Sequence, residues 1–125
     1  MTRLIDVLIA DDHSLFAEAL QAILGTDSRF KVVGLARDGK EAVQLASSLD
    51  PDVVLMDISM PVMDGFEATR RLREHDPEAC VLMLTGSNAR VDVDKARKSG
   101  ASGYVTKDRI AAELIEAIIE ISSRG

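Results

Sequence analysis

Two spacings of apolar residues alternate along the 125 residues of the chain. Five short runs are apolar at successive positions and rich in Val, Ile, Leu and Met. Runs of this kind are typical of strands that are covered on both faces, as in a parallel sheet. The predicted strands are "VLIA" (7–10), "KVVGLA" (31–36), "DVVLMD" (52–57), "CVLML" (80–84) and "GYVT" (103–106).

The segments between these runs place apolar residues three and four positions apart, which is the spacing of one helix face. The clearest covers 14–24, and Gly25 directly after it is the expected C-cap. Asp64 is a typical N-cap residue, and Glu67 three positions later completes the pattern of a capping box. We expect helices over 14–24, 39–49, 64–75, 88–99 and 109–123.

The last predicted helix has a wide apolar face, which two interpretations explain equally well. The whole face packs on the core, or part of it pairs with a partner such as a second copy of the chain. The residues concerned are Ile110, Leu114, Ile118 and Ile121 on one line, with Ile115 and Ile119 beside them.

The alternation of strands and helices predicts an α/β fold, a doubly wound (βα)5 parallel sheet with right-handed crossovers. No linker or low-complexity segment interrupts the pattern, so we expect one domain over residues 1–125. In such sheets, ligands bind beyond the carboxyl ends of the strands. The residues at those ends are therefore the first place to look for chemistry.

Reactive side chains follow four of the five predicted strands. Asp11 and Asp12 end the first strand, Asp57 the third, Thr85 the fourth and Lys107 the fifth. Carboxylates this close together repel one another, so some carry protons or a cation lies between them. An all-oxygen set favours a hard ion such as Mg²⁺. With a hydroxyl and an ammonium group added, the set predicts a phosphoryl-binding site in which Asp57 is the nucleophile and a metal ligand.

Four motifs in a fixed order resemble those of a response-regulator receiver domain, and the resemblance covers essentially all of the chain. Two of them also resemble the NarL/FixJ-type transcription regulators, in which a LuxR-type helix-turn-helix domain follows the receiver. The family implies a flavodoxin-like (CheY-like) sheet with strand order 2-1-3-4-5. Receivers commonly have proline after the lysine, where this chain has Asp108. The motifs are "IADDH" (9–13), "LMDISMPVMDG" (55–65), "MLTG" (83–86) and "SGYVTKD" (102–108).

The resemblance implies a metal site and a phospho-acceptor. Asp57 is then the phosphorylated residue and binds Mg²⁺ or Mn²⁺. Asp12 binds the metal directly, and Asp11 binds it directly or through water. The backbone carbonyl of Ser59 completes the protein ligands. Taken alone, an acid such as Asp12 would also fit the N-cap of the first helix.

The resemblance also implies how the phosphate is held and read. Thr85 and Lys107 hold phosphate oxygens, and Tyr104 is the aromatic switch residue. On sequence alone, the Tyr104 ring fits a packed position at the sheet edge equally well. Ser59 and Ser87 flank the site and are candidates for tuning hydrolysis of the phosphate.

By the same resemblance, the chain is a signalling switch rather than an enzyme, apart from catalysing its own phosphorylation and dephosphorylation. A sensor histidine kinase is the expected donor, a homodimer is possible, and a DNA-binding effector domain is expected beyond this chain. The alternatives are a free-standing receiver that acts by protein contact or in a phosphorelay, and a haloacid-dehalogenase-type phosphatase. The phosphatase fits poorly, because its second Asp is replaced by Ser59.

Composition limits which partners and which cellular location we expect for this chain. The net charge of −6 disfavours nucleic-acid binding by this chain alone. No apolar run approaches the roughly 20 residues that span a bilayer, so the cytoplasm is the expected location. Cys80 is the single cysteine, which excludes an internal disulfide, and we expect it to be a small buried residue. His13 lies beside the acid pair, and we expect an exposed first-turn side chain, with a metal or proton role left open.

Overall fold

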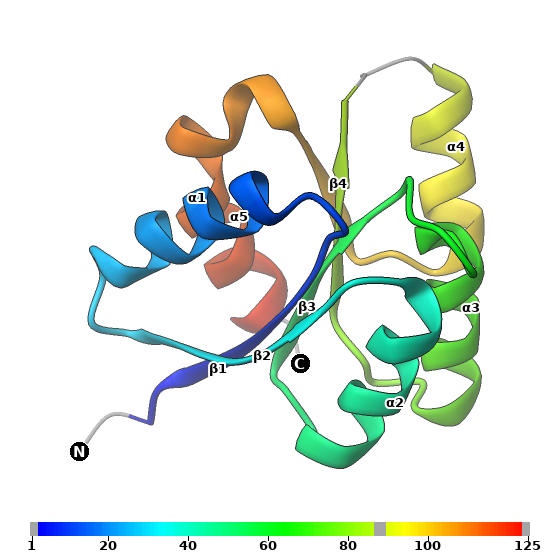
Figure 1. The fold of residues 1–125 in the computed structure, drawn as a ribbon, viewed down its shortest axis with the longest axis horizontal. Helices are drawn as coiled ribbons and strands as arrows, with labels where there is room; N and C mark the ends of the chain where they lie inside the picture. Colours follow the sequence, from blue (N-terminus) through cyan, green and yellow to red (C-terminus); the bar gives the residue numbers. More distant parts are fainter. Residues whose placement is uncertain (1–2, 87–89, 124–125) are drawn as a thin grey trace.

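The computed structural model describes residues 3–86 and 90–123, the side chain of Ser123 excepted. Within this part, five parallel strands form one sheet in the order β2-β1-β3-β4-β5 (Figure 1). The expected doubly wound fold and strand order are therefore confirmed. The strands are β1 (Ile5–Ala10), β2 (Phe30–Ala36), β3 (Val53–Asp57), β4 (Val81–Thr85) and β5 (Gly103–Thr106). The helices are α1 (Ser14–Gly25), α2 (Gly39–Leu49), α3 (Gly65–His75), α4 (Arg90–Ser99) and α5 (Ile110–Ser123), with a 3-10 turn η1 (Lys107–Arg109) before α5.

The helices cover both faces of the sheet. Figure 1 shows α1 and α5 on one side and α2, α3 and α4 on the other. Neighbouring strand residues point to opposite faces: Val7 and Ile9 pack in the core under α1 and α5, whereas Leu8 and Ala10 pack in the core under α2 and α3. This burial on both faces explains why each strand is apolar at successive positions.

The wide apolar face of α5 packs on the core. Ile110, Leu114, Ile118 and Ile121 are buried in the cluster that includes α1. Ile115 and Ile119, which lie beside this line of four residues, are partly buried against the same cluster. The core interpretation accounts for the line of four residues.

The end of α1 differs from the prediction. Gly25 is the last residue of the helix rather than its left-handed cap, so the C-cap prediction was wrong. The cap is Thr26, which has right-handed helical backbone angles and donates its N–H to the carbonyls of Ile23 and Leu24. Its hydroxyl also donates to the Ile23 carbonyl at 2.7 Å. These bonds close the helix without a positive φ.

The start of α3 follows half of the predicted pattern. The Asp64 side chain accepts the Glu67 N–H at 2.9 Å, as an N-cap residue does. The Glu67 carboxylate pairs instead with Arg70 and Arg71 on the exposed side of the helix. The N-cap is confirmed, and the reciprocal half of the capping box is replaced by surface ion pairs.

Other boundaries shift by a few residues. Asp52 precedes β3 because its carboxylate turns back to accept the Asp6 N–H at 2.7 Å and a bond from Arg3. Cys80 precedes β4 and is half-buried rather than buried. The expected start of the fourth helix, at residue 88, lies outside the described residues, in which α4 begins at Arg90.

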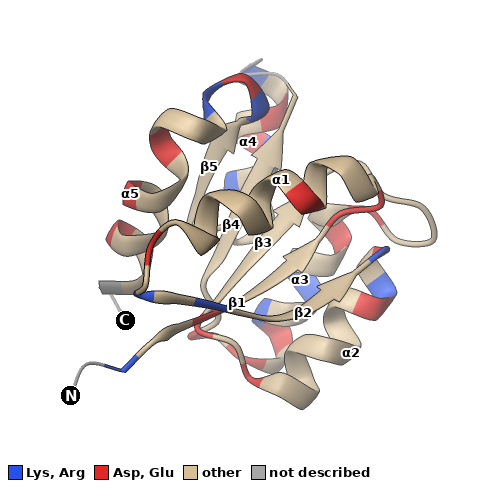
Figure 2. Ribbon diagram, turned by 60° about the vertical axis from the view of Figure 1, so that its left-hand side comes forward, with Lys and Arg blue, Asp and Glu red and all other residues tan. Residues whose placement is uncertain are grey.

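Charged residues are spread over the surface. Figure 2 shows Lys and Arg interleaved with Asp and Glu over several elements rather than gathered on one basic face. This distribution agrees with the acidic net charge of −6. Among the helices that the structure describes, none combines the length and the apolar character that crossing a bilayer requires.

Candidate functional site

The parallel register brings the acids together at the carboxyl edge of the sheet. Ala10 is aligned with Met56 on the neighbouring strand, so the next residues, Asp11 and Asp57, lie side by side. The N–H of Asp11 still bonds to the backbone of β2, to the Ala36 carbonyl at 2.9 Å, which fixes its position. The sheet itself therefore places both carboxylates, as the sequence predicted.

The other predicted side chains arrive from β4 and β5. Thr85 is aligned with Thr106, and Lys107 follows directly as the first residue of η1. Thr85 is buried, and the Lys107 side chain is partly exposed. Lys107 Nζ lies 3.4 Å from Asp57 Oδ2, so this ammonium reaches across from the end of β5 to the acid at the end of β3.

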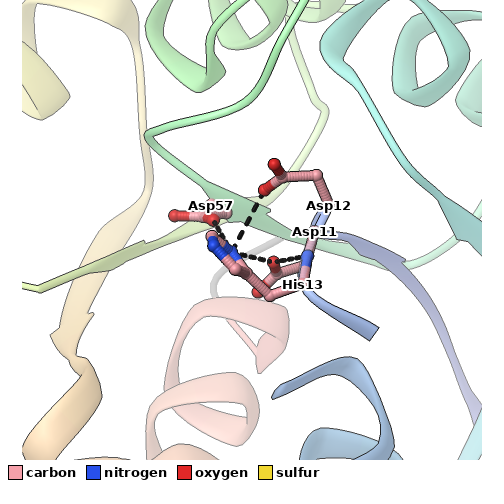
Figure 3. A group of neighbouring side chains, drawn as sticks. All are labelled: Asp11, Asp12, His13 and Asp57. Carbon is pink, nitrogen blue, oxygen red and sulfur yellow. Dashed lines mark hydrogen bonds and ion pairs between the residues drawn. The ribbon is translucent and has the colours of Figure 1, made fainter. Parts of the chain in front are cut away.

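Three carboxylates and one imidazole form a compact cluster. Asp11, Asp12, His13 and Asp57 each offer one ligand atom, and these atoms lie within 4.8 Å of one another (Figure 3). Asp57 is 1% exposed and Asp11 4%, whereas Asp12 and His13 lie at the mouth of the site. His13, and not Asp12, occupies the N-cap position of α1.

Two carboxylate oxygens of the cluster, Asp11 Oδ2 and Asp57 Oδ2, are buried and have no hydrogen-bond partner within the part of the chain that the structure describes. The other oxygen of each acid is satisfied, since Asp11 Oδ1 accepts the His13 N–H at 2.8 Å and Asp57 Oδ1 accepts the Ser59 N–H at 3.3 Å. Buried polar atoms usually have partners, so these two oxygens point to a bound group. The oxygen-rich set fits a hard divalent cation such as Mg²⁺.

The pKa of the Asp57 carboxyl is raised above its ordinary value. Burial is the main cause, because it penalises the charged form, and the nearby charge of Asp11 adds to it. The Lys107 ammonium acts in the opposite direction and favours the charged carboxylate. The charged form of the Asp57 carboxyl is therefore unfavourable in this environment, and an additional positive charge nearby would stabilise it.

Phe16, which lies within the helix predicted over 14–24, is a site residue that the sequence pattern did not single out. Lys107 Nζ lies 4.6 Å from the centroid of the Phe16 ring, within the range of a cation–π contact. The ring therefore holds the ammonium group from the side of α1. The available signal was position: Phe16 lies in the first turn after Asp11 and Asp12, and so at the same edge of the sheet.

The remaining predicted residues lie farther from the acids or expose their side chains. Tyr104 on the edge strand β5 is 44% exposed, so its ring is not packed into the core. Ser59 is exposed, and its N–H bonds to Asp57. Ser87 lies outside the described residues. The Cys80 thiol lies 3.6 Å from the Ile121 carbonyl oxygen, near the opposite edge of the sheet.

The loop after Asp57 contains a strained turn. Val62 has φ 69°, and the Met63 N–H donates to the Pro61 carbonyl at 2.7 Å, which makes a three-residue γ-turn. A β-branched residue rarely adopts a positive φ. The Val62 side chain is also 78% exposed, so no packing of that side chain holds the turn in place.

The first residue of α3 packs directly against the phospho-acceptor candidate. The Gly65 N–H donates to the Ile58 carbonyl at 3.0 Å. A Cβ added at Gly65 would collide with the backbone carbonyl oxygen of Asp57. Only glycine allows the helix to begin this close to the acid.

Comparisons with known proteins agree with this geometry. The family model described as "Response regulator receiver domain" matches residues 7–119. Transcriptional regulatory protein DegU of Brevibacillus brevis is 42% identical over 121 residues, which are 97% of this chain and 51% of that protein. The chain spans about half the length of the curated transcriptional regulators it matches.

Solved structures show the same fold. The signal receiver domain of the putative response regulator NarL from Mycobacterium tuberculosis has a TM-score of 0.92 and 31% identity, covering 97% of this chain and 98% of that one. A chain of the CheX–CheY–BeF3–Mg²⁺ complex from Borrelia burgdorferi has a TM-score of 0.86 and 28% identity, with 93% and 87% covered. The chain therefore belongs to the response-regulator receiver domains of two-component signalling, and within them to the NarL/DegU type.

Proposed function

We propose that this receiver is a phosphorylation-dependent switch in which Asp57 accepts a phosphoryl group from a sensor histidine kinase in the cytoplasm. The observation that carries the proposal is Asp57 Oδ2, which is buried, has no hydrogen-bond partner among residues 3–86 and 90–123, and lies 3.4 Å from Lys107 Nζ. A carboxylate oxygen in this state is available to attack phosphorus, and the ammonium beside it can take an oxygen of the incoming group.

The transfer step balances without an added reactant. A carboxylate oxygen of Asp57 forms a bond to phosphorus while the phosphorus–nitrogen bond of the donor phosphohistidine breaks. The leaving imidazole keeps the electron pair and takes up a proton from solvent water. Lys107 and the buried Thr85 hydroxyl hold the phosphoryl oxygens, and water later hydrolyses the acyl phosphate. Ser59 and Ser87 are placed in sequence to influence that hydrolysis.

The acids fit a divalent metal. Asp11, Asp12, Asp57 and the Ser59 backbone carbonyl would hold Mg²⁺ or Mn²⁺, and the two orphaned buried oxygens support this assignment. When bound, the ion neutralises charge on the carboxylates and on the phosphoryl oxygens. The structural neighbour from Borrelia, whose complex contains BeF3 and Mg²⁺, supports the same arrangement here.

Phosphorylation replaces the single negative charge of the Asp57 carboxylate with a phosphoryl group that carries about two negative charges and three acceptor oxygens. The Thr85 hydroxyl then turns toward the phosphoryl group, and the partly exposed Tyr104 ring moves into the space that it leaves. The segment from α4 to β5 settles in a second arrangement that presents a different surface. The exposed position of Tyr104 supports this role, because the ring has room to move.

We assign the output to transcription. The match to DegU, a transcriptional regulatory protein of which this chain covers 51%, supports a DNA-binding helix-turn-helix effector in the natural protein. Phosphorylation would then favour a homodimer that binds DNA. The alternative is a free-standing receiver that acts by protein contact or in a phosphorelay, and the 87% coverage of the Borrelia chain favours it.

The test is intact-protein mass spectrometry after incubation with Mg²⁺ and acetyl phosphate. We expect one Mg²⁺-dependent phosphoryl addition in the wild type and none in Asp57→Ala. Asp76→Ala is the control, because Asp76 caps the far end of α3 and lies away from the site. An unmodified wild-type protein, or addition that persists in Asp57→Ala, would contradict the proposal.

A further inference from the structure

The imidazole of His13 enters the acidic cluster from the N-cap position of α1 (Figure 3). Its Nδ1 lies 3.2 Å from Asp12 Oδ1, 3.3 Å from Asp11 Oδ1 and 3.9 Å from Asp57 Oδ2. We propose that this nitrogen is a fourth side-chain ligand of the divalent cation and shifts the site's preference from Mg²⁺ toward later first-row ions such as Ni²⁺. The inference rests on the metal site of the proposed function.

The spacing of the donor atoms supports ligation of one ion. Around an octahedral ion with bonds of about 2.1 Å, adjacent ligand atoms lie about 3.0 Å apart and opposite ones about 4.2 Å apart. The 3.2 Å separation between Nδ1 and Asp12 Oδ1 matches adjacent ligands, and the 3.9 Å separation between Nδ1 and Asp57 Oδ2 approaches the opposite arrangement. The whole set lies within 4.8 Å, so one ion can reach every member after small side-chain rotations.

A simple hydrogen bond explains the arrangement less well. A single ring N–H points at one acceptor, and an N–H···O bond is usually 2.7–3.2 Å long. Here Nδ1 meets hydrogen-bond geometry with Asp11 Oδ1 at 3.3 Å, just beyond that range, while Asp12 Oδ1 lies nearer, at 3.2 Å, and Asp57 Oδ2 lies at 3.9 Å. Convergence of several donors on one point is the pattern of a coordination site rather than of a directed bond.

The backbone holds His13 in place while its ring stays adjustable. The His13 N–H donates to Asp11 Oδ1 at 2.8 Å, which fixes the start of the side chain beside that acid. The ring makes no capping bond to α1, and the side chain is 64% exposed. In the same cluster, Asp11 Oδ2 and Asp57 Oδ2 are buried and have no hydrogen-bond partner among the described residues. These two oxygens support, independently of the His13 contacts, a ligand at this point.

A nitrogen ligand changes which ion the site favours. Mg²⁺ prefers oxygen ligands, whereas imidazole suits the later first-row divalent ions, whose affinity rises from Mn²⁺ to Ni²⁺. Asp11, Asp12 and Asp57 alone would form a hard oxygen site. The addition of His13 Nδ1 strengthens Ni²⁺ binding much more than Mg²⁺ binding.

The first test is calorimetric titration of the wild type and His13→Ala with Mg²⁺ and with Ni²⁺, at about pH 8, where a free imidazole is neutral. We expect His13→Ala to weaken Ni²⁺ binding at least about tenfold, since losing even an outer-shell partner typically costs 10- to 100-fold. Mg²⁺ affinity should change far less. His75→Ala is the matched control, because His75 is the other histidine and ends α3. Equal changes for both ions, or no change, would overturn the proposal.

The second test detects the nitrogen directly. Pulsed electron paramagnetic resonance of the Mn²⁺-loaded wild type and His75→Ala should show ¹⁴N coupling that His13→Ala lacks. If the wild type becomes phosphorylated with Mg²⁺ but shows no nitrogen coupling with Mn²⁺, ligation by His13 is refuted and the proposed function is not. Conversely, nitrogen coupling in a wild type that never accepts a phosphoryl group on Asp57 would refute the proposed function and leave the ligand assignment standing.

Discussion

Lys107 Nζ lies 3.4 Å from Asp57 Oδ2 and 4.6 Å from the centroid of the Phe16 ring, so one ammonium group contacts both a buried carboxylate and an aromatic face. The two partners belong to separate elements, Asp57 to β3 and Phe16 to α1, and Lys107 reaches both from η1. The ring limits where the ammonium can go and thereby keeps it near the acid. The site therefore depends on where this ammonium group lies as well as on its charge.

Lys107→Met should slow phosphoryl addition to Asp57 about 100-fold, the usual effect of losing one group that stabilises developing charge. The measurement is the rate of mass increase with acetyl phosphate and Mg²⁺. Lys95→Met is the matched control, because Lys95 also lies over a ring, with Nζ 5.7 Å from the Phe66 centroid. A similar rate for both variants would show that Lys107 does not act on the phosphoryl group.

Asp57→Asn should stabilise the metal-free protein at neutral pH. Folding raises the pKa of Asp57, so the stability that depends on its protonated form is complete below the unfolded value and lost as pH rises through the folded value. The amide carries no charge and avoids this loss, and its advantage should shrink as pH falls toward about 4. Urea unfolding in EDTA across this range is the measurement. Glu74→Gln, on the exposed side of α3, should show no such trend.

Mg²⁺ should raise the free energy of unfolding by about 1.4 kcal/mol at ten times its dissociation constant, because it binds the folded state. EDTA should reverse the gain. Asp11→Asn should largely abolish it, because Asp11 supplies one of the two orphaned buried oxygens. Thermal unfolding at constant ionic strength separates this effect from general screening. An equal gain in Asp11→Asn would place the ion elsewhere.

Gly65→Ala should destabilise the fold by about 1–3 kcal/mol, the usual range for a side chain forced into filled space. The added methyl group would push α3 away from the Asp57 carbonyl. Gly25→Ala is the control, since a Cβ there meets no atom within 4 Å and Gly25 lies in a helix. It should stabilise the protein by about 0.5–1 kcal/mol. Chemical denaturation distinguishes the two signs.

Val62→Gly should stabilise the protein by about 1 kcal/mol, since a non-glycine residue with left-handed backbone angles costs about 1–3 kcal/mol. The change also removes an exposed apolar side chain that makes little contact with the core. Val91→Gly, at another largely exposed valine that lies within α4, should instead lose about 0.3–0.5 kcal/mol of stability. Opposite signs in chemical denaturation would confirm the strain at Val62, and a loss in both variants would contradict it.

The fold could be predicted because the buried strands consist of consecutive apolar residues, a pattern that is visible in the sequence. All five residues of β3 and of β4 are buried, so both strands read as continuous apolar runs. Strand register then carried Asp11, Asp57 and Lys107 to one edge. The end of α1 was harder to predict, because it depends on hydrogen bonds made by Thr26.

Two features of the site could not be predicted from strand positions. The contacts of Phe16 and His13 depend on how α1 lies across the sheet edge and on side-chain rotamers, which apolar spacing does not encode. The positive φ of Val62 is equally hidden, because valine is a residue that normally avoids it.

The close approach at Gly65 also limits how this domain can be recombined. A helix grafted in place of α3 from another protein would need glycine as its first residue, because any larger residue meets the Asp57 carbonyl. The graft junction is thus restricted by the backbone of the acid, independently of the sequence chosen for the rest of the helix.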